Sequence, residues 1–232
     1  MKRSGLICVS IMADDMAGVM AVTRPILPLI DLVEVRLDSI KSPVMDDWPN
    51  RIGRPVLATN RPVWEGGQFV GTEEERIIQL CQAVRAGAQY VDIELRTDQG
   101  LRQMVQEEAE KYGAQLILSY HDFAVTPDDW VLEGILQQMM AEKGKIAGKI
   151  ITTARTSGDV LRVLALQKQA MAAGFPLSAF AMGTIGRISR LATLYLGGFM
   201  TYVAPDAVSA TAPGQLSIHD LHAIMGLLQG EA

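Results

Sequence analysis

The sequence predicts an α/β protein that folds as a single (β/α)8 TIM barrel. Short apolar, β-rich runs recur along the chain, and longer segments with helical spacing or helix-start residues separate them. The length of 232 residues also suits eight strand–helix units, so we expect one catalytic domain over residues 1–232. The predicted strands are 6–12, 32–38, 55–60, 90–95, 115–122, 146–154, 176–183 and 200–205.

Residues that start and end helices occupy the segments between these strands. Glycines stand where several helices should end, at Gly87, Gly113 and Gly174. The helix-start signals are Thr72 with Glu75, the run Thr126–Asp129 with its proline, Thr156 with Asp159, and Ser217 with Asp220. Because strands joined by helical crossovers are parallel, we expect eight alternating strands and helices to close a parallel barrel.

An open doubly wound sheet is the alternative fold with the same alternation. Such a sheet normally carries a phosphate-binding Gly-x-Gly-x-x-Gly after its first strand. Residues 10–18 read SIMADDMAG at that place, so the fingerprint is absent. The barrel is therefore the favoured arrangement.

Composition and charge exclude several classes of partner. Hydrophobic residues make up 49% of the chain and charged residues 20%, as in ordinary soluble enzymes. A net charge of −5 gives no reason to expect binding to nucleic acid or to an anionic membrane. No run approaches the roughly 18 apolar residues of a membrane span. Cys8 and Cys81 lie far apart in apolar stretches, which is typical of free thiols in a reducing compartment, so we expect a cytoplasmic protein.

Lys149 is unusual because it lies inside an apolar strand, in the run Ile146–Ala154. A lysine taken out of water loses affinity for its proton, and its amine can then attack a ketone to form a Schiff base. A lysine that extends from a strand end to solvent is the equally simple alternative. The surrounding residues have to decide between the two.

Polar side chains gather near the carboxyl ends of the predicted strands, where barrel enzymes place their chemistry. Period-two alternation puts Glu34, Arg36 and Asp38 on one strand face, and we expect that face to line the barrel mouth. The alternative is a strand-end salt bridge. Asp92 and Glu94 alternate in the same way on the next strand but one.

His121 lies on the strand immediately before the one that carries Lys149. Its ordinary pKa near 6.5 suits proton transfer, and neighbouring strands are about 4.8 Å apart, so both side chains could flank one substrate carbon. A structural histidine with satisfied hydrogen bonds is the alternative. His219 and His222 are read as surface residues, because no further ligands complete a metal site around them. We therefore expect no metal site at these two histidines.

Three loops carry residues that could reach the barrel mouth. Arg61 and Glu65, followed by Gly66 and Gly67, suggest a mobile loop that carries charge over the mouth, or else a plain surface loop. Arg187 and Arg190 are expected at a helix start, where the helix dipole opposes them and an anionic substrate could compensate. The segment 205–215 contains proline and glycine and is expected to act as a lid.

Taken together, these segments resemble type I 3-dehydroquinate dehydratase. The matching motifs follow the family's order over nearly the whole chain, and SYHDF, ISR and APGQ are specific in combination. They are EVRLD (34–38), Arg61 with Glu65-Gly66-Gly67, VDIEL (91–95), SYHDF with a following TP (119–127), the GKI of the Lys149 strand, MGTIGRISR (182–190) and TAPGQLS (211–217).

The resemblance implies a (β/α)8 barrel, free of metal and cofactor, that dehydrates 3-dehydroquinate to 3-dehydroshikimate in the shikimate pathway. It implies that Lys149 forms the Schiff base, that His121 is the general acid and base, and that Glu65 holds His121. It also implies a homodimer, although no sequence stripe identifies an interface. The implied substrate-binding residues are Glu34, Arg36, Arg61, Met182, Arg190, Thr211 and Gln215.

The sequence departs from the family at three places and leaves two other functions open. After the strand lysine it reads KIITTA (149–154), where the family often has KIA followed by Met-Pro or similar residues. Thr211 stands where the family usually has serine. Many bacterial members begin with an extra hairpin beneath the barrel, whereas this sequence reaches its first strand at once, so we expect its floor to be closed differently. The alternative functions are another Schiff-base lyase or class I aldolase on the same fold, and a barrel that binds a ligand without turnover.

Overall fold

The computed structural model describes residues 3–41 and 47–229, which form a (β/α)8 barrel. Eight parallel strands follow the order β7-β6-β5-β4-β3-β2-β1-β8. All eight overlap the predicted runs, so the fold class and the strand positions are confirmed. The strands are β1 (Leu6–Ile11), β2 (Leu32–Arg36), β3 (Val56–Thr59), β4 (Tyr90–Glu94), β5 (Gln115–His121), β6 (Ile146–Thr153), β7 (Leu177–Met182) and β8 (Met200–Val203).

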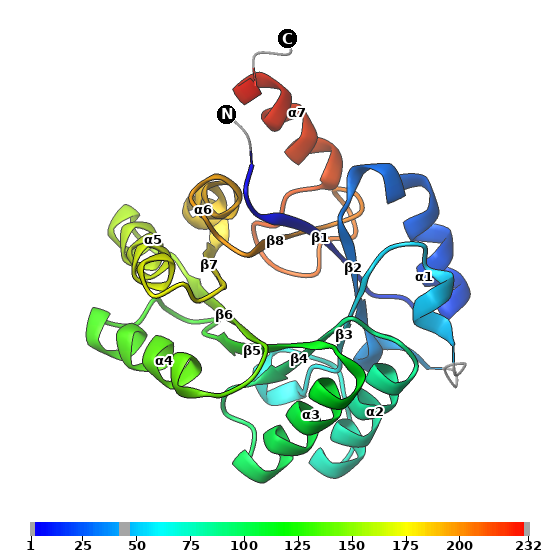
Figure 1. Ribbon diagram of the computed structural model, residues 1–232. Coiled ribbons are helices and arrows are strands. Elements are labelled where there is room, and N and C mark those ends of the chain that lie inside the picture. The colour runs from blue at the N-terminus through cyan, green and yellow to red at the C-terminus, as the bar shows by residue number, and fades with distance from the viewer. Residues whose placement is uncertain (1–2, 42–46, 230–232) are drawn as a thin grey trace.

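The helices form an outer ring around the strands (Figure 1). Within the described ranges, no helix is long and apolar enough to cross a membrane. The α-helices are α1 (Met16–Thr23), α2 (Glu73–Arg85), α3 (Gln99–Tyr112), α4 (Asp129–Ala141), α5 (Ser157–Ala172), α6 (Gly183–Tyr195) and α7 (Ile218–Gln229). Short 3-10 helices add η1 (Arg24–Leu29), η2 (Leu37–Ser39), η3 (Trp48–Arg51) and η4 (Val63–Glu65).

One crossover differs from the others in its described part. Between β2 and β3, the described residues 37–41 and 47–55 contain only the 3-10 helices η2 and η3. The chain after η3 reads Ile52-Gly53-Arg54-Pro55, and Gly53 has a left-handed φ of 82°. A left-handed glycine followed by a proline ends a helix after one turn, so this crossover stays short.

The predicted caps mostly begin helices as expected. Thr72 with Glu75 and Thr156 with Asp159 form complete capping boxes at the starts of α2 and α5. The run Thr126–Asp129 is different: α4 begins at Asp129, with Asp128 in the N-cap position. The Thr126 hydroxyl is instead within hydrogen-bond distance of the Thr152 hydroxyl, at 2.8 Å, which ties the start of this crossover to β6.

Apolar side chains form two cores, one on each side of the strand layer. The larger core fills the space between strands and helices. The smaller core lies inside the barrel and includes Cys8, Leu57 and Ile117. At its amino-terminal floor, partly buried Tyr90 and Phe199 pack against this inner core with ring centroids 6.3 Å apart. Tyr90 is the first residue of β4 and Phe199 immediately precedes β8, so both rings lie at the amino-terminal end of the barrel.

The barrel has one weakly bonded seam, between β7 and β8. Among the described strands, every other neighbouring pair shares a hydrogen-bonded ladder, but β7 and β8 do not. The seam is bridged by a bond of 2.8 Å from the Phe199 N–H to the Leu177 carbonyl. A second bond of 3.1 Å runs from the Met200 N–H to the Ser178 hydroxyl. A serine side chain thus takes the place of a backbone acceptor.

Candidate active site

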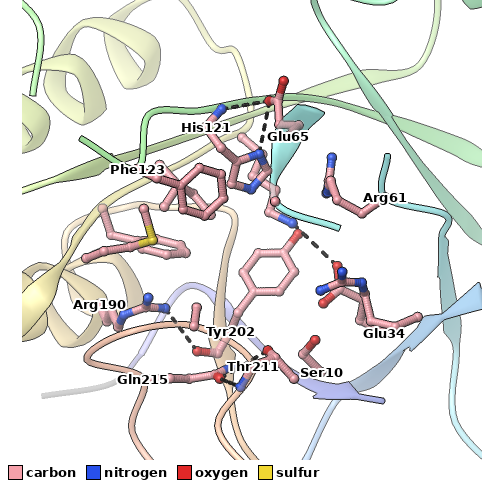
Figure 2. Close-up of a pocket in the computed structure, with 17 residues that line it drawn as sticks. Ser10, Glu34, Arg61, Glu65, His121, Phe123, Arg190, Tyr202, Thr211 and Gln215 are labelled. Carbon is pink, nitrogen blue, oxygen red and sulfur yellow. Dashed lines mark hydrogen bonds and ion pairs between the residues drawn. The ribbon is translucent and has the colours of Figure 1, made fainter. Parts of the chain in front are cut away.

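A polar cavity opens at the carboxyl ends of the strands, where catalytic residues of such barrels belong. Its empty volume, counted out to the open mouth, is about 520 Å³. All ten side chains predicted from the sequence line it, and Figure 2 shows them converging from strands and loops on all sides. The predicted residues are Glu34, Arg36, Arg61, Glu65, His121, Lys149, Met182, Arg190, Thr211 and Gln215.

Lys149 extends from β6 into the barrel and is only 3% exposed, so the alternative of a lysine reaching out to solvent is wrong. Its Nζ lies 3.1 Å from Asp92 Oδ2 and 3.4 Å from Glu34 Oε1. Burial alone would raise the pKa of Glu34, but Lys149 and Arg36 hold it below its usual value. The Lys149 amine therefore lies between two buried carboxylates.

A line of buried ion pairs continues from Asp92 away from the amine. Arg61 Nη2 lies 2.8 Å from Asp92 Oδ1, and Arg61 Nη1 lies 2.6 Å from Glu94 Oε1. Glu94 in turn pairs with Arg76, which is fully buried near the start of α2. Against the effect of burial, Arg61 and Lys149 hold the pKa of Asp92 far below its usual range. Both Nη atoms of Arg61 thus already contact protein partners.

His121 and Glu65 form a pair at the edge of the cavity. Glu65 Oε1 accepts a hydrogen bond of 2.8 Å from the His121 backbone N–H and lies 3.2 Å from the ring Nδ1. Burial, reinforced by Arg61 and Lys149, lowers the pKa of His121 well below 6.5. The neutral ring that donates Nδ1–H to Glu65 leaves its Nε2 lone pair free to accept a proton.

The Glu65 carboxyl has an unusual proton affinity of its own. Burial, aided by repulsion from Glu94, raises its pKa to about 7 even though Arg61 opposes the shift. Its second oxygen, Oε2, is buried without a hydrogen-bond partner among the described residues. Glu65 therefore gains or loses a proton near neutral pH, and its anionic form can stabilise an imidazolium on His121.

The loop after β3 brings Arg61 and Glu65 into the cavity. Both were expected on a loop that carries charge over the mouth, but they are 4% and 2% exposed. Asp38 holds this loop, because its carboxylate accepts the backbone N–H groups of Arg61 and Gln68 at 3.2 and 3.0 Å. A side chain at Gly67 would place its Cβ 1.9 Å from the Arg61 carbonyl oxygen, so only glycine fits this turn.

Strand alternation predicted that Glu34, Arg36 and Asp38 face the barrel mouth, and this holds for two of the three. Glu34 and Arg36 line the cavity, whereas Asp38 belongs to η2 and does not. Asp38 instead makes a two-point pair with Arg36, from Nε to Oδ1 at 2.8 Å and from Nη2 to Oδ2 at 2.6 Å. Asp38 therefore fixes the Arg36 guanidinium at the cavity wall.

Arg190 supplies a second positive charge to the cavity. It was expected at a helix start, but it lies in the middle of α6, 2% exposed, because α6 already begins at Gly183. Its guanidinium packs over the Phe180 ring at 4.6 Å. Among the described residues its hydrogen-bond acceptors are the carbonyl oxygens of Tyr202 and Pro213, each at a long 3.5 Å. Burial, with help from Arg187, lowers the pKa of Arg190 to about 10.

No carboxylate in the described part of the chain pairs with Arg190, and its Nε has no partner there either. A buried cation with open donors attracts an anionic ligand group. On the same side of the cavity, Gln215 Oε1 accepts hydrogen bonds from the Thr211 N–H at 2.7 Å and its hydroxyl at 3.2 Å. These bonds fold the segment expected to act as a lid against the cavity wall (Figure 2).

Sequence reasoning missed several side chains that line the cavity. Phe123 stacks on the His121 ring at 5.9 Å, and Tyr202 lies beneath Lys149 Nζ at 4.0 Å. Phe123 belongs to the SYHDF motif, and strand parity relative to Met182 could have found Phe180. The remaining wall residues, Ser10, Ile151 and Ala212, look like ordinary small or core residues in the sequence.

The two other histidines lie away from the cavity. His219 is exposed, and His222 is half-buried with its Nε2 2.8 Å from the Leu29 carbonyl oxygen. Within residues 3–41 and 47–229, no group of three or more His, Cys, Asp or Glu side chains is arranged to hold a metal ion.

Comparison with known proteins places the chain in a family. The family model for type I 3-dehydroquinase matches residues 7–232. A 3-dehydroquinate dehydratase of Desulfotalea psychrophila is 44% identical over 194 residues, covering 84% of this chain and 85% of that protein. One of Methanococcus maripaludis is 30% identical over 224 residues, covering 97% of this chain and 100% of that protein.

A solved structure agrees with these sequence matches. The crystal structure of 3-dehydroquinate dehydratase from Geobacillus kaustophilus superposes with a TM-score of 0.87 at 25% identity, covering 98% of this chain and 92% of that chain. The barrel, the lysine-bearing cavity and these relationships lead to one conclusion: the chain belongs to the type I 3-dehydroquinase family.

Proposed function

We propose that this protein dehydrates 3-dehydroquinate to 3-dehydroshikimate, the shikimate-pathway step of aromatic amino-acid biosynthesis, through a Schiff base on Lys149. The observation that carries the proposal is the buried Lys149 amine in the same cavity as the neutral His121 ring. Membership of the type I 3-dehydroquinase family supports the choice of substrate. An unpaired Arg190 supports a substrate that carries a carboxylate.

The reaction begins with formation of the imine. Lys149 Nζ loses a proton and adds its lone pair to the C3 ketone carbon, and the resulting carbinolamine loses water to give an iminium. The iminium withdraws electrons and makes the neighbouring C2 hydrogen acidic. Because the lysine itself supplies the electron sink, the chemistry requires neither a metal nor a cofactor.

His121 then moves the proton twice. Its neutral Nε2 takes the C2 proton, and the electrons of the broken bond form an enamine. The enamine electrons expel the C1 hydroxyl while the imidazolium returns its proton to that oxygen, so water leaves. Since one ring serves both transfers, they occur on one face of the substrate, which makes the elimination syn. Water finally hydrolyses the iminium to release product and free Lys149.

The other cavity residues position these groups and the substrate. Glu65 orients His121 and stabilises its charged form, and Arg190 binds the substrate carboxylate. Met182 packs against the ring. Contacts to the hydroxyls and the ketone region come from Glu34, Arg36, Arg61, Thr211 and Gln215. For Arg61, whose two Nη atoms already contact Asp92 and Glu94, the main effect is to hold Asp92 beside the amine.

Borohydride trapping tests this proposal directly. Reducing the enzyme in the presence of 3-dehydroquinate should leave a mass adduct on the peptide that contains Lys149, and Lys149→Ala should abolish both adduct and turnover. Lys145→Ala is the matched control, because Lys145 is exposed and only four residues away in the same segment. An adduct elsewhere, or none, would reject the assignment.

The same assay separates the competing activities. Turnover appears as the absorbance of the conjugated enone product. A class I aldolase would instead cleave a phosphorylated aldol substrate, and a silent barrel would bind 3-dehydroquinate without producing the enone. Either result would replace dehydration as the function.

We also propose that the chain works as a cytoplasmic homodimer whose residues 1–232 form one catalytic domain. Cys8 and Cys81 are free and buried, as expected in a reducing compartment. The homodimer follows from the family resemblance and is tested by light scattering during size-exclusion chromatography, where a mass of one chain would contradict it.

A further inference from the structure

Tyr202 lies directly against the amine that forms the Schiff base. It is a β8 residue, 4% exposed, and the Lys149 Nζ stands 4.0 Å from the centre of its ring. Phe180 supports the ring from another direction, with ring centroids 6.0 Å apart. Figure 2 shows the ring in the middle of the cavity, between Arg190 and Glu34. No step of the reaction derived above uses this residue.

The described residues around Tyr202 offer its hydroxyl no hydrogen-bond partner. The hydroxyl is buried, although its side chain lines the cavity. Burial raises its pKa well above 10, so the phenol keeps its proton and remains a donor. A buried donor without an acceptor costs free energy, and that cost is recovered when a ligand oxygen arrives.

The reaction changes which groups can stabilise the Lys149 nitrogen. As an ammonium the nitrogen carries three N–H donors, which Glu34 and Asp92 share. As a protonated imine it carries one, so at most one of these carboxylates keeps its hydrogen bond. The positive charge persists in both states. An aromatic face attracts a cation without needing an N–H group, so the ring becomes the more important partner in the iminium state.

We propose that Tyr202 is a positioning residue of the Schiff-base reaction: its ring face holds the iminium nitrogen of Lys149, and its hydroxyl donates a hydrogen bond to an oxygen of the bound substrate. The inference rests on the proposed dehydration and deepens it. The ring of Tyr202 would stabilise the covalent intermediate, and its hydroxyl would bind the substrate.

The role of the ring is tested with a graded series at position 202. Tyrosine is replaced by phenylalanine, 4-fluorophenylalanine and 3,4,5-trifluorophenylalanine. These rings have similar shapes, but each added fluorine weakens the negative electrostatic potential of the ring face. The substrate concentration for half-maximal borohydride trapping should rise stepwise, by about 3- to 10-fold from the first to the last member. A residue that merely fills space would give the same value in all three.

The role of the hydroxyl is tested by comparing wild type with Tyr202→Phe. Loss of one hydrogen bond to the substrate should raise KM by about 3- to 10-fold while trapping at saturating substrate stays complete. Tyr112→Phe is the control, because Tyr112 is exposed and its ring also faces a lysine, with Lys111 Nζ at 5.1 Å. An unchanged KM in Tyr202→Phe would overturn the assignment of the hydroxyl.

Wild-type enzyme separates failure of the inference from failure of the proposed function. If wild type traps no adduct and produces no enone, the dehydration itself is rejected. If wild type does both and the fluorinated series is flat, dehydration stands and the role of the Tyr202 ring is rejected. Circular dichroism of each variant verifies that the fold is intact before the kinetics are compared.

Discussion

The Nζ of Lys149 lies 3.1 Å from Oδ2 of Asp92, and both side chains are buried inside the barrel. The amine is therefore one half of a buried ion pair as well as the proposed nucleophile. Because Glu34 also contacts the same nitrogen, Lys149 shares with Arg36 and Arg61 the stabilisation of two carboxylates that are costly to bury as anions.

Replacing Lys149 with methionine should reduce stability as well as activity. The substitution preserves length but leaves Glu34 and Asp92 without their shared cation, which should lower the free energy of unfolding by about 3 kcal/mol. Adding Glu34→Gln should recover part of that loss without restoring turnover. Urea denaturation measures both effects, and Lys149→Arg is the control that keeps the charge. An unchanged midpoint in Lys149→Met would show that the pair has no role in folding.

Removing the imidazole should separate proton transfer from covalent capture. His121→Ala should lower kcat by about 10²- to 10⁴-fold, because it removes the proposed general acid and base. Borohydride should still trap an adduct on Lys149, since imine formation uses the amine. Enone absorbance and peptide mass measure the two steps separately. Near-normal turnover in this variant would remove His121 from the proposed mechanism.

Glu65 should set the acid side of the pH profile. Its pKa is raised to about 7, whereas that of His121 lies well below 6.5. As pH rises through about 7, Glu65 becomes anionic and can stabilise the imidazolium, so wild-type kcat/KM should increase over that range. In Glu65→Gln this rise should vanish, leaving a plateau about 10- to 100-fold lower at pH 8. A wild-type profile that is flat from pH 6 to 8 would contradict this coupling.

Arg190 should control substrate affinity more than rate. Arg190→Met should raise KM for 3-dehydroquinate by about 10²-fold, because a buried charge-assisted hydrogen bond to the carboxylate is lost. The matched control is Arg187→Met, an exposed arginine three residues earlier on α6, which should leave KM unchanged. Steady-state kinetics give the comparison. Equal effects in the two variants would point to general electrostatics in place of a specific contact.

The turn at Gly67 should be intolerant of any side chain. Gly67→Ala would place a Cβ 1.9 Å from the Arg61 carbonyl oxygen, which displaces the loop that carries Arg61 and Glu65. We expect turnover to fall by at least about 10-fold and the melting temperature to drop. Gly134→Ala is the opposite case, because a Cβ there meets nothing within 4 Å, and it should stabilise α4 by about 0.5–1 kcal/mol.

The sequence predicted the fold, and it predicted side chains that line the cavity, for identifiable physical reasons. Alternation on β2 indicated that Glu34 and Arg36 share a face, and a charged face could only be turned to the mouth. The presence of Lys149 in an apolar strand likewise indicated burial. These inferences depend on the period of a strand, which the sequence shows directly.

The contacts between elements could not be predicted in the same way. Nothing local to Arg61 indicates that Asp92 and Glu94 occupy both of its Nη atoms, because these residues come together only when β3 and β4 pair. Tyr202 was not singled out from the sequence, since an aromatic ring on a barrel strand is usually only packing. The position of Arg190 was missed because helix α6 begins immediately after β7.

The seam between β7 and β8 has a mechanical consequence for the site. Arg190 lies on the helix after β7 and Tyr202 lies on β8, so the two residues flank the strand pair with the fewest backbone hydrogen bonds. The Arg190 guanidinium donates a long hydrogen bond of 3.5 Å to the Tyr202 carbonyl oxygen and so links the two sides of the seam. A ligand carboxylate bound to Arg190 would therefore stabilise the barrel at the seam where its backbone hydrogen bonding is weakest. Amide exchange at Phe199 and Met200 should therefore slow when the cavity is filled.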